Sequence, residues 1–185
     1  MISNESMAVE RLKNVRVVLV EPSHPGNIGA AARALKTMGL GGLALVNPKR
    51  FPDPQAEWRA AGAQDVLDAA SVHDSLAGAI ADCQWVVGTG MLVRRIPWPR
   101  QDVAGAAAEI LAQPVQAQGG VVVGRETSGR TNEELQQCHT HLRIPANPDY
   151  ASLNLAMAVQ VVAYEVCLAL RERAAAVMRR EGHVP

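Results

Sequence analysis

Three short segments contain the residues best suited to binding a ligand. We name them the first signature (residues 25–33), the second signature (residues 124–135) and the third signature (residues 144–155). Each combines glycine, proline or asparagine with polar side chains where a strand or loop is expected to lead into a helix. Turns of this kind bring the backbone close to a ligand and point unpaired N–H groups at it. Three of them in one chain of 185 residues predict one composite site.

Arg33, at the end of the first signature, is the candidate for contact with a charged ligand. On a helical wheel it lies roughly opposite the apolar stripe that begins at Ile28, so its side chain is expected to point out of the core. A cation in the first half of a helix opposes the helix dipole, so stability does not explain its presence. The preceding turn, Pro25-Gly26-Asn27, exposes N–H groups suited to a phosphate. An exposed, solvated arginine is the alternative.

Glycines also follow two of the expected strands, Gly124 after residues 121–123 and Gly88-Thr89-Gly90 after residues 85–87. Ligands of open α/β sheets bind beyond the carboxyl ends of the strands, although such glycines can also serve only a tight turn. We give the two interpretations equal weight. The three-glycine dinucleotide motif and the Walker motif are both absent, which argues against a nicotinamide enzyme and a nucleotide hydrolase.

Other catalytic and metal motifs receive little support. The chain has no Gly-x-Ser-x-Gly elbow and no obvious Ser/His/Asp trio. Near Cys138, the side chains of His139 and His141 would share one face of a strand. No carboxylate or second cysteine stands at ligand spacing nearby, so we expect a structural role for these histidines and no metal.

Clustered cations mark two expected loops. Arg94 and Arg95 precede Trp98 in one loop, and Lys49-Arg50 lie in another. Cations on loops suit a phosphate backbone, and an indole can stack on a base. For either loop alone, a solvated surface is the slightly favoured interpretation.

Composition limits the class of protein. Eighteen basic and eighteen acidic residues give zero formal net charge, which excludes a strongly cationic coat for nucleic acid but not a local basic patch. Hydrophobic residues make up 48% of the chain, enough for one domain with a sizeable core. Three widely spaced cysteines argue against a disulfide framework and favour a reducing, cytoplasmic location. No segment is apolar and long enough to suggest a membrane span.

Repeated strand-then-helix order, with continuous apolar strands, predicts a parallel α/β sheet covered by helices on both faces. We expect a flexible lead at residues 1–14, one domain at 15–170, and a basic helix end and tail at 171–185. The expected strands are residues 15–20, 43–46, 85–87, 121–123 and 142–144. The expected helices are residues 28–38, 57–61, 73–81, 103–111, a short helix capped at 131, and a long final helix from 152 or 154.

Together, the three signatures resemble those of the knotted SPOUT superfamily of RNA 2′-O-ribose methyltransferases. Within it, the chain is most similar to the bacterial tRNA methyltransferases that modify cytidine or uridine at position 32 of the anticodon loop. The resemblance extends from Val15 to the final helix. Its motifs also include Met38-Gly39-Leu40, Leu45-Val46-Asn47-Pro48, Thr131-Asn132-Glu133-Glu134-Leu135, Ser152-Leu153-Asn154-Leu155 and Tyr164-Glu165.

The resemblance implies that the sheet contains a deep trefoil knot in its C-terminal part and that the protein is a homodimer joined through its first and last helices. It implies S-adenosylmethionine as the cofactor and tRNA as the partner. It also implies that the protein neither associates with a membrane nor binds a metal. The chain departs from the family pattern at Gly90-Met91 and at Arg130, both near the implied cofactor pocket. The cofactor-binding residues carried over are Thr89, Gly90, Met91, Gly124, Ile144, Ser152, Leu153 and Asn154.

The implied reaction is in-line attack of a ribose 2′-oxygen on the sulfonium methyl group. Arg33, Ser152 and Asn154 are the implied catalytic residues, and Asn27, Arg33, Arg94 and Arg95 the implied RNA contacts. Arginine is hard to deprotonate, so we expect Arg33 to bind the adjacent phosphate and stabilise the alkoxide rather than act as a base. Two alternatives are an rRNA target and a non-catalytic RNA-binding module with the same fold.

Overall fold

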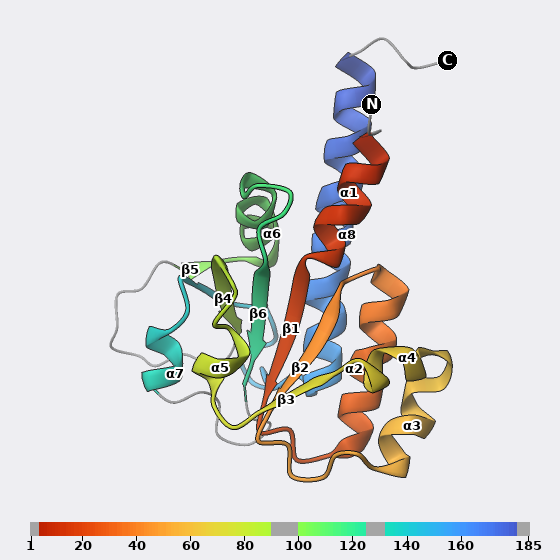
Figure 1. Ribbon diagram of the computed structural model, residues 1–185. Helices are drawn as coiled ribbons and strands as arrows, with labels where there is room; N and C mark the ends of the chain where they lie inside the picture. Colours follow the sequence, from red (N-terminus) through yellow and green to blue (C-terminus); the bar gives the residue numbers. More distant parts are fainter. Residues whose placement is uncertain (1–3, 90–99, 125–131, 181–185) are drawn as a thin grey trace.

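The computed structural model describes residues 4–89, 100–124 and 132–180 (Figure 1). Within these ranges seven strands form one sheet in the order β3-β2-β1-β6-β4-β7-β5, and every pair is parallel. The strands are β1 Val15–Val20, β2 Gly42–Val46, β3 Ser71–His73, β4 Trp85–Thr89, β5 Arg100–Gln101, β6 Gly119–Val123 and β7 Thr140–Leu142. The predicted parallel sheet is therefore confirmed.

Helices cover both faces of this sheet, as the continuous apolar strands predicted. Alternate residues of β1 enter two different apolar clusters, Val17 and Leu19 in one and Val18 and Val20 in the other. The larger cluster lies under α1, α2, α6 and α8, and the smaller one under α5. The helices are α1 Asn4–Lys13, α2 Pro25–Met38, α3 Pro54–Ala60, α4 Gln64–Asp68, α5 Leu76–Ala79, α6 Val103–Ala112, α7 Asn132–Gln136 and α8 Leu155–Arg180, with a 3-10 turn at Ala61–Ala63.

Helix α2 follows β1 directly and contains the first signature. Proline is favoured at the first turn of a helix, where its missing N–H has no partner to lose, and Pro25 begins α2. The helix ends at Gly39, whose φ of 78° is the left-handed conformation that glycine adopts most easily. Gly29 lets α3 approach closely, because a β-carbon there would lie 2.0 Å from the carbonyl oxygen of Ala56.

Helix α8 runs along the length of the molecule beside α1, α2 and α6 (Figure 1). Its predicted apolar stripe is confirmed, since the stripe is buried in the larger cluster. The stripe comprises Leu155, Val159, Val162, Val166 and Leu170. None of the helices in the described part of the chain is both long enough and apolar enough to span a membrane.

Several local expectations differ from the structure. Residues 4–13 form α1 instead of a flexible lead, because Leu12 is buried and Arg11 bonds to the end of α6. The expected helix at 73–81 is confirmed only in part, as the short α5 at Leu76–Ala79. Strand β3 before it was not predicted, because periodicity could not reveal a three-residue edge strand. Strand β7 begins at Thr140, two residues before the expected strand. The long final helix extends to Arg180, in agreement with the basic helix end expected after residue 170.

The expected trefoil knot and the helix cap at Thr131 depend on segments 90–99 and 125–131. These segments lie outside the described residues. Both features stay predictions.

Candidate functional site

The three signatures begin at one edge of the sheet, which we call the carboxyl edge. In the parallel register, Leu19 and Thr89 both pair with Val123, and Thr89 also pairs with Leu142. The carboxyl ends of β1, β6, β4 and β7 therefore lie side by side. Because these strands are neighbours in space but not in sequence, the fold brings together turns that are far apart along the chain.

The first and third signatures meet through a hydrogen bond between two asparagines. Asn154 Nδ2 donates to Asn27 Oδ1 at 3.1 Å, across 127 positions of sequence. The Oδ1 atom of Asn154 accepts from the backbone N–H of Ala156 at 2.9 Å and of Met157 at 3.4 Å. Asn154 is therefore the N-cap of α8, one of the two residues predicted for that role, and it also links α8 to α2.

The second signature begins beside two of the predicted cofactor residues. Thr89 is 4% exposed, and its hydroxyl donates to the carbonyl of Val122 at 3.2 Å. Gly124 is buried directly after the partner strand, and Ile144 packs partly buried against the larger cluster. Register thus places Thr89, Gly124 and the segment leading to Ile144 at the ends of adjacent strands.

Other predicted site residues are exposed at the same edge. Arg33 is exposed on α2, and its side chain has neither a hydrogen bond nor an ion pair to any of the described residues. Ser152 and Leu153 are exposed just before α8, and within the described ranges no hydrogen bond joins them to Thr89 or Gly124. The arginine is thus available to a ligand, as the helical wheel predicted.

The remaining predicted residues cannot be placed. Gly90, Met91, Arg94, Arg95 and the departure at Arg130 all lie outside the described residues.

Two backbone features of the carboxyl edge were missed by sequence reasoning. Glu21 follows β1 with φ 48°, and Asn47 follows β2 with φ 46°. Left-handed backbone is uncommon for residues with a β-carbon and is enriched at functional edges. The Glu21 N–H donates to Val46 at 2.7 Å, and Asn47 Nδ2 donates to Asp74 at 2.9 Å, which holds both turns. Because asparagine tolerates this conformation, Asn47 was a possible sequence signal for its turn. Glutamate at position 21 gave no such signal.

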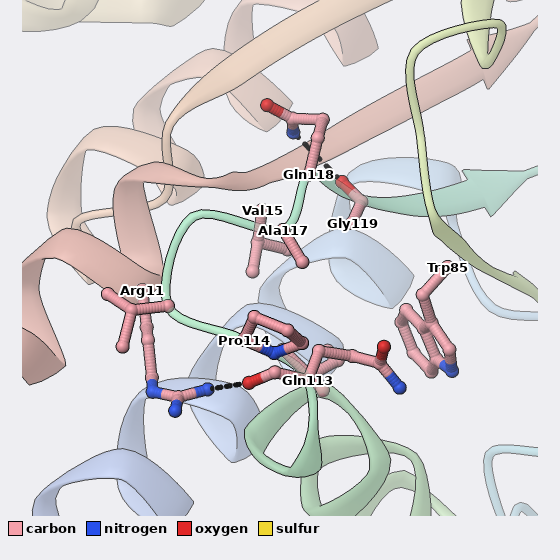
Figure 2. Close-up of a pocket in the computed structure, with 10 residues that line it drawn as sticks. Arg11, Val15, Trp85, Gln113, Pro114, Ala117, Gln118 and Gly119 are labelled. Carbon is pink, nitrogen blue, oxygen red and sulfur yellow. Dashed lines mark hydrogen bonds between the residues drawn. The ribbon is translucent and has the colours of Figure 1, made fainter.

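The pocket in Figure 2 lies at the other end of the sheet. Its lining includes Val15, Trp85 and Gly119, the first residues of β1, β4 and β6, together with Arg11 and Pro114. It is therefore remote from the carboxyl edge and from all three signatures.

One of the two histidines near Cys138 has a structural use. His139 Nδ1 accepts a hydrogen bond from the Val86 N–H at 2.9 Å, which ties the start of β7 to β4. In the part of the chain that the structure describes, no three metal-ligating side chains come together.

Comparison with known proteins agrees with the geometry. The profile of the SpoU rRNA Methylase family matches residues 14–164. The tRNA (cytidine/uridine-2′-O-)-methyltransferase TrmJ of Cronobacter sakazakii is 54% identical over 158 residues, which are 85% of this chain and 64% of that protein. The chain therefore spans just under two thirds of the length of this curated relative.

Two solved structures share the fold. A protein described as a probable methylase family protein, from Haemophilus influenzae Rd KW20, superposes with a TM-score of 0.83 at 48% identity, covering 88% of this chain and 66% of that one. TrmJ from Z. mobilis ZM4 superposes with a TM-score of 0.78 at 38% identity, covering 82% of this chain and 67% of that one.

Proposed function

The chain belongs to the SpoU rRNA Methylase family, and from this premise we propose that it transfers a methyl group from S-adenosylmethionine to a ribose 2′-hydroxyl of RNA. The proposed substrate is tRNA, at cytidine or uridine 32 of the anticodon loop. The observation that carries the proposal is the meeting of signatures one and three through Asn27 and Asn154, beside the strand ends that begin signature two. The name of the TrmJ relative supports the choice of tRNA.

The described residues fit a nucleoside cofactor at the carboxyl edge. Gly124 is buried and has no side chain to cover its backbone groups. Thr89 supplies a hydroxyl group, and Ile144 supplies an apolar wall. In the proposal these residues, with Gly90, Met91, Ser152, Leu153 and Asn154, hold S-adenosylmethionine. When bound, that cofactor supplies a methyl group activated by the sulfonium charge.

The proposed part of Arg33 is electrostatic. A guanidinium group pairs with phosphate oxygens, so Arg33 binds the phosphate next to the target ribose and stabilises negative charge on the 2′-oxygen. Fixing the ribose in line with the methyl group removes much of the entropic barrier to reaction. Ser152 and Asn154 orient the ribose or the cofactor carboxylate, and Asn27 contacts the RNA, together with Arg94 and Arg95.

The proposal includes a homodimer joined through the first and last helices, and the exposed face of α8 supports it. Leu153, Met157 and Tyr164 are 39%, 62% and 51% exposed, and the last two share the solvent side of α8 with half-buried Val161. An apolar stripe of this kind is typical of an interface. The cytoplasm is the proposed location, and the three free cysteines are compatible with a reducing compartment.

Two measurements test the function. Calorimetry is expected to show micromolar binding of S-adenosylmethionine, and mapping of ribose methylation is expected to show position 32 of tRNA unmodified in a deletion strain. No cofactor binding would favour an RNA-binding module instead. If the deletion strain lost ribose methylation in rRNA while its tRNA was unaffected, the substrate would be rRNA instead of tRNA.

A further inference from the structure

The outer surface of α3 exposes an aromatic side chain that the monomer does not use. Trp58 is 75% exposed, while Ala56 and Ala60 on the other side of the same helix are buried against α2. Successive residues of a helix are rotated by about 100°, so Trp58 points almost directly away from this buried pair. An indole that is open on its faces is available for stacking.

Arg59, the next residue, reaches toward the first signature. A β-carbon built on Gly26 would lie 3.4 Å from Arg59 Cγ and 3.9 Å from Arg59 Nε, so the arginine stem crosses the start of α2. Arg59 is exposed and, among the described residues, has no hydrogen-bond or ion-pair partner. Its charge is therefore available to an anion.

Nearby carboxylates do not neutralise this charge. Asp53 is paired with Arg50 at 3.4 Å, and Asp65 is paired with Lys36 at 2.9 Å. Glu57 is exposed but lies on the flank of α3 opposite Arg59, because the two positions are about 160° apart around the helix axis.

Arg59 and Arg33 border the same strip of surface. Gly26, Ala30 and Arg33 are spaced i, i+4 and i+7, so they share one face of α2. The aliphatic part of the Arg59 side chain crosses Gly26, the first residue of this row. Arg33 is the last residue of the row. The guanidinium groups of Arg59 and Arg33, both unpaired among the described residues, therefore lie at the two ends of a short surface strip. The strip itself consists of two small residues. Figure 1 shows α2 and α3 side by side, with both helices starting at the carboxyl edge.

The adjoining loop adds a further cation. The backbone N–H of Lys49 donates to the carbonyl of Pro22 at 3.2 Å, which fixes the loop after β2 against the turn before α2. The Lys49 side chain is exposed at this place. Although the whole chain has no net charge, cations are concentrated here next to an open indole.

We propose that Trp58 and Arg59 extend the RNA-binding surface from Arg33 onto α3 and contact unpaired nucleotides flanking the target ribose. Guanidinium groups pair with phosphate oxygens, and an exposed indole stacks on a base that is not already stacked in a duplex. This combination fits a single-stranded loop better than a regular helix of RNA. The inference rests on the proposed function, because it assigns residues that position the same substrate.

Fluorescence anisotropy with a labelled tRNA transcript tests the proposal on the full chain. Trp58→Ala is expected to raise Kd about tenfold, and Trp58→Phe to restore most of the affinity, because base stacking needs an aromatic face. Arg59→Ala is expected to raise Kd about fivefold and to lower the slope of log Kd against log salt by about 0.7, the value for one lost phosphate contact on a single strand. The exposed Arg179→Ala, at the far end of α8, is the matched control.

The outcomes separate this inference from the proposed function. If the wild type methylates tRNA but the α3 variants bind it like the Arg179 control, the inference is overturned and the function stands. If Trp58→Ala changes the sedimentation coefficient instead of RNA affinity, α3 contacts protein and the inference is again overturned. A wild type that neither binds nor methylates tRNA overturns both. Thermal melting of each variant is expected to match the wild type, because both side chains are exposed.

Discussion

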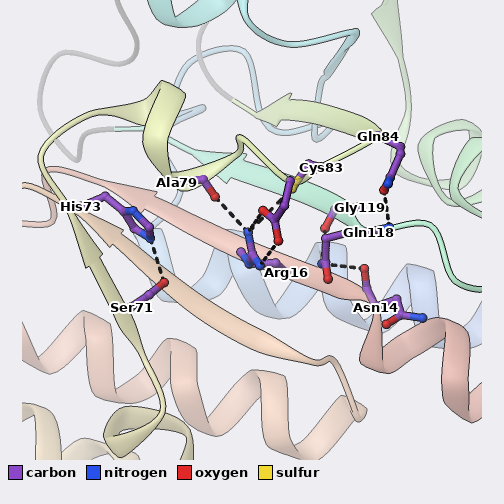
Figure 3. Close-up of polar contacts among 10 residues, drawn as sticks. Asn14, Arg16, Ser71, His73, Ala79, Cys83, Gln84, Gln118 and Gly119 are labelled. Carbon is purple, nitrogen blue, oxygen red and sulfur yellow. Dashed lines mark hydrogen bonds and ion pairs between the residues drawn. The ribbon is translucent and has the colours of Figure 1, made fainter.

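Polar side chains at the amino ends of the strands differ from Arg33 at the carboxyl edge in whether they have a partner among the described residues. At the amino ends of the strands, Gln118 Nε2 donates to the Asn14 carbonyl at 2.8 Å and the Gln118 backbone N–H donates to Gln84 Oε1 (Figure 3). Asn14 Nδ2 in turn donates to the Val115 carbonyl at 2.8 Å. At the carboxyl edge, Arg33 has no side-chain partner within the described ranges. Polar groups at the first end hold the fold together, whereas the Arg33 side chain at the second remains available to a ligand.

Arginines show the same contrast. Arg11 and Arg173 both donate to the Leu111 carbonyl, at 3.0 and 2.9 Å, and Arg11 also donates to the Gln113 carbonyl (Figure 2). These carbonyls are at the C-terminal end of α6, where cations are favourable. Burial, followed by the charge of Arg173, lowers the pKa of Arg11. An arginine with this many fixed partners stabilises structure and is not free to bind RNA.

Arg33→Ala is expected to produce the largest change. Loss of a charge that stabilises the developing alkoxide should reduce kcat by about 10²–10³-fold, which single-turnover methylation of tRNA would measure. Arg33→Lys should recover part of the rate, since it keeps the charge but loses the planar fork. Near-normal turnover in both variants would remove Arg33 from the mechanism. The melting temperature should stay unchanged, because the side chain is exposed.

Gly29→Ala is expected to disturb the carboxyl edge by separating α2 from α3. The added methyl would lie 2.0 Å from the Ala56 oxygen, and overpacking of this kind destabilises by about 2–3 kcal/mol, measurable by urea unfolding. Gly26→Ala is the control, because its β-carbon would meet only the Arg59 side chain at ordinary contact distance. Equal stabilities for the two variants would contradict the close approach of the helices.

Arg11→Ala is expected to lower the free energy of unfolding by about 1.5 kcal/mol, the scale of a charged hydrogen bond, without affecting kcat. Its effect should not add to that of Arg173→Ala, because both side chains share the Leu111 carbonyl. Denaturant titration of the two single variants and the double variant gives the coupling. If Arg11→Ala lost methylation activity while its stability stayed unchanged, the purely structural role assigned to Arg11 would be wrong.

Asn154→Ala should destabilise the protein by about 1 kcal/mol, through loss of the N-cap of α8. Asn154→Asp separates capping from the contact to Asn27. A carboxylate still caps the helix but cannot donate to Asn27 Oδ1. We expect this variant to unfold like the wild type in thermal melts and yet to methylate more slowly. Full activity would show that the asparagine pair is structural only.

Asp82→Asn should have the smallest effect. Arg16 donates to both carboxylate oxygens of Asp82, at 2.6 and 2.9 Å (Figure 3). This hydrogen bonding lowers the pKa of Asp82. A carboxyl whose folded pKa is lowered stabilises above its unfolded pKa of about 3.9, and this contribution is lost as pH falls through the folded value.

The Asp82 carboxylate is largely exposed, so the wild type should exceed Asp82→Asn by only about 0.5 kcal/mol at pH 7. Urea unfolding as a function of pH should show the difference vanish below the folded pKa of Asp82. A difference that persists there would have to arise from packing.

Much of the fold was determined by the sequence. Continuous valine and leucine runs specify buried parallel strands, and the stripe on α8 specifies which side of that helix is covered, because apolar periodicity reports burial directly. Arg33 could be identified as exposed for the same reason. Short edge elements such as β3 were missed, since three residues contain too little pattern to distinguish a strand from a helix.

Only the tertiary structure decided which distant residues meet. The hydrogen bond of Asn27 to Asn154 and the passage of Arg59 over Gly26 join segments that share no local pattern. Strand order and helix crossing determine these contacts. Both arise from packing the whole core, whereas sequence periodicity reports only which face of each element turns inward.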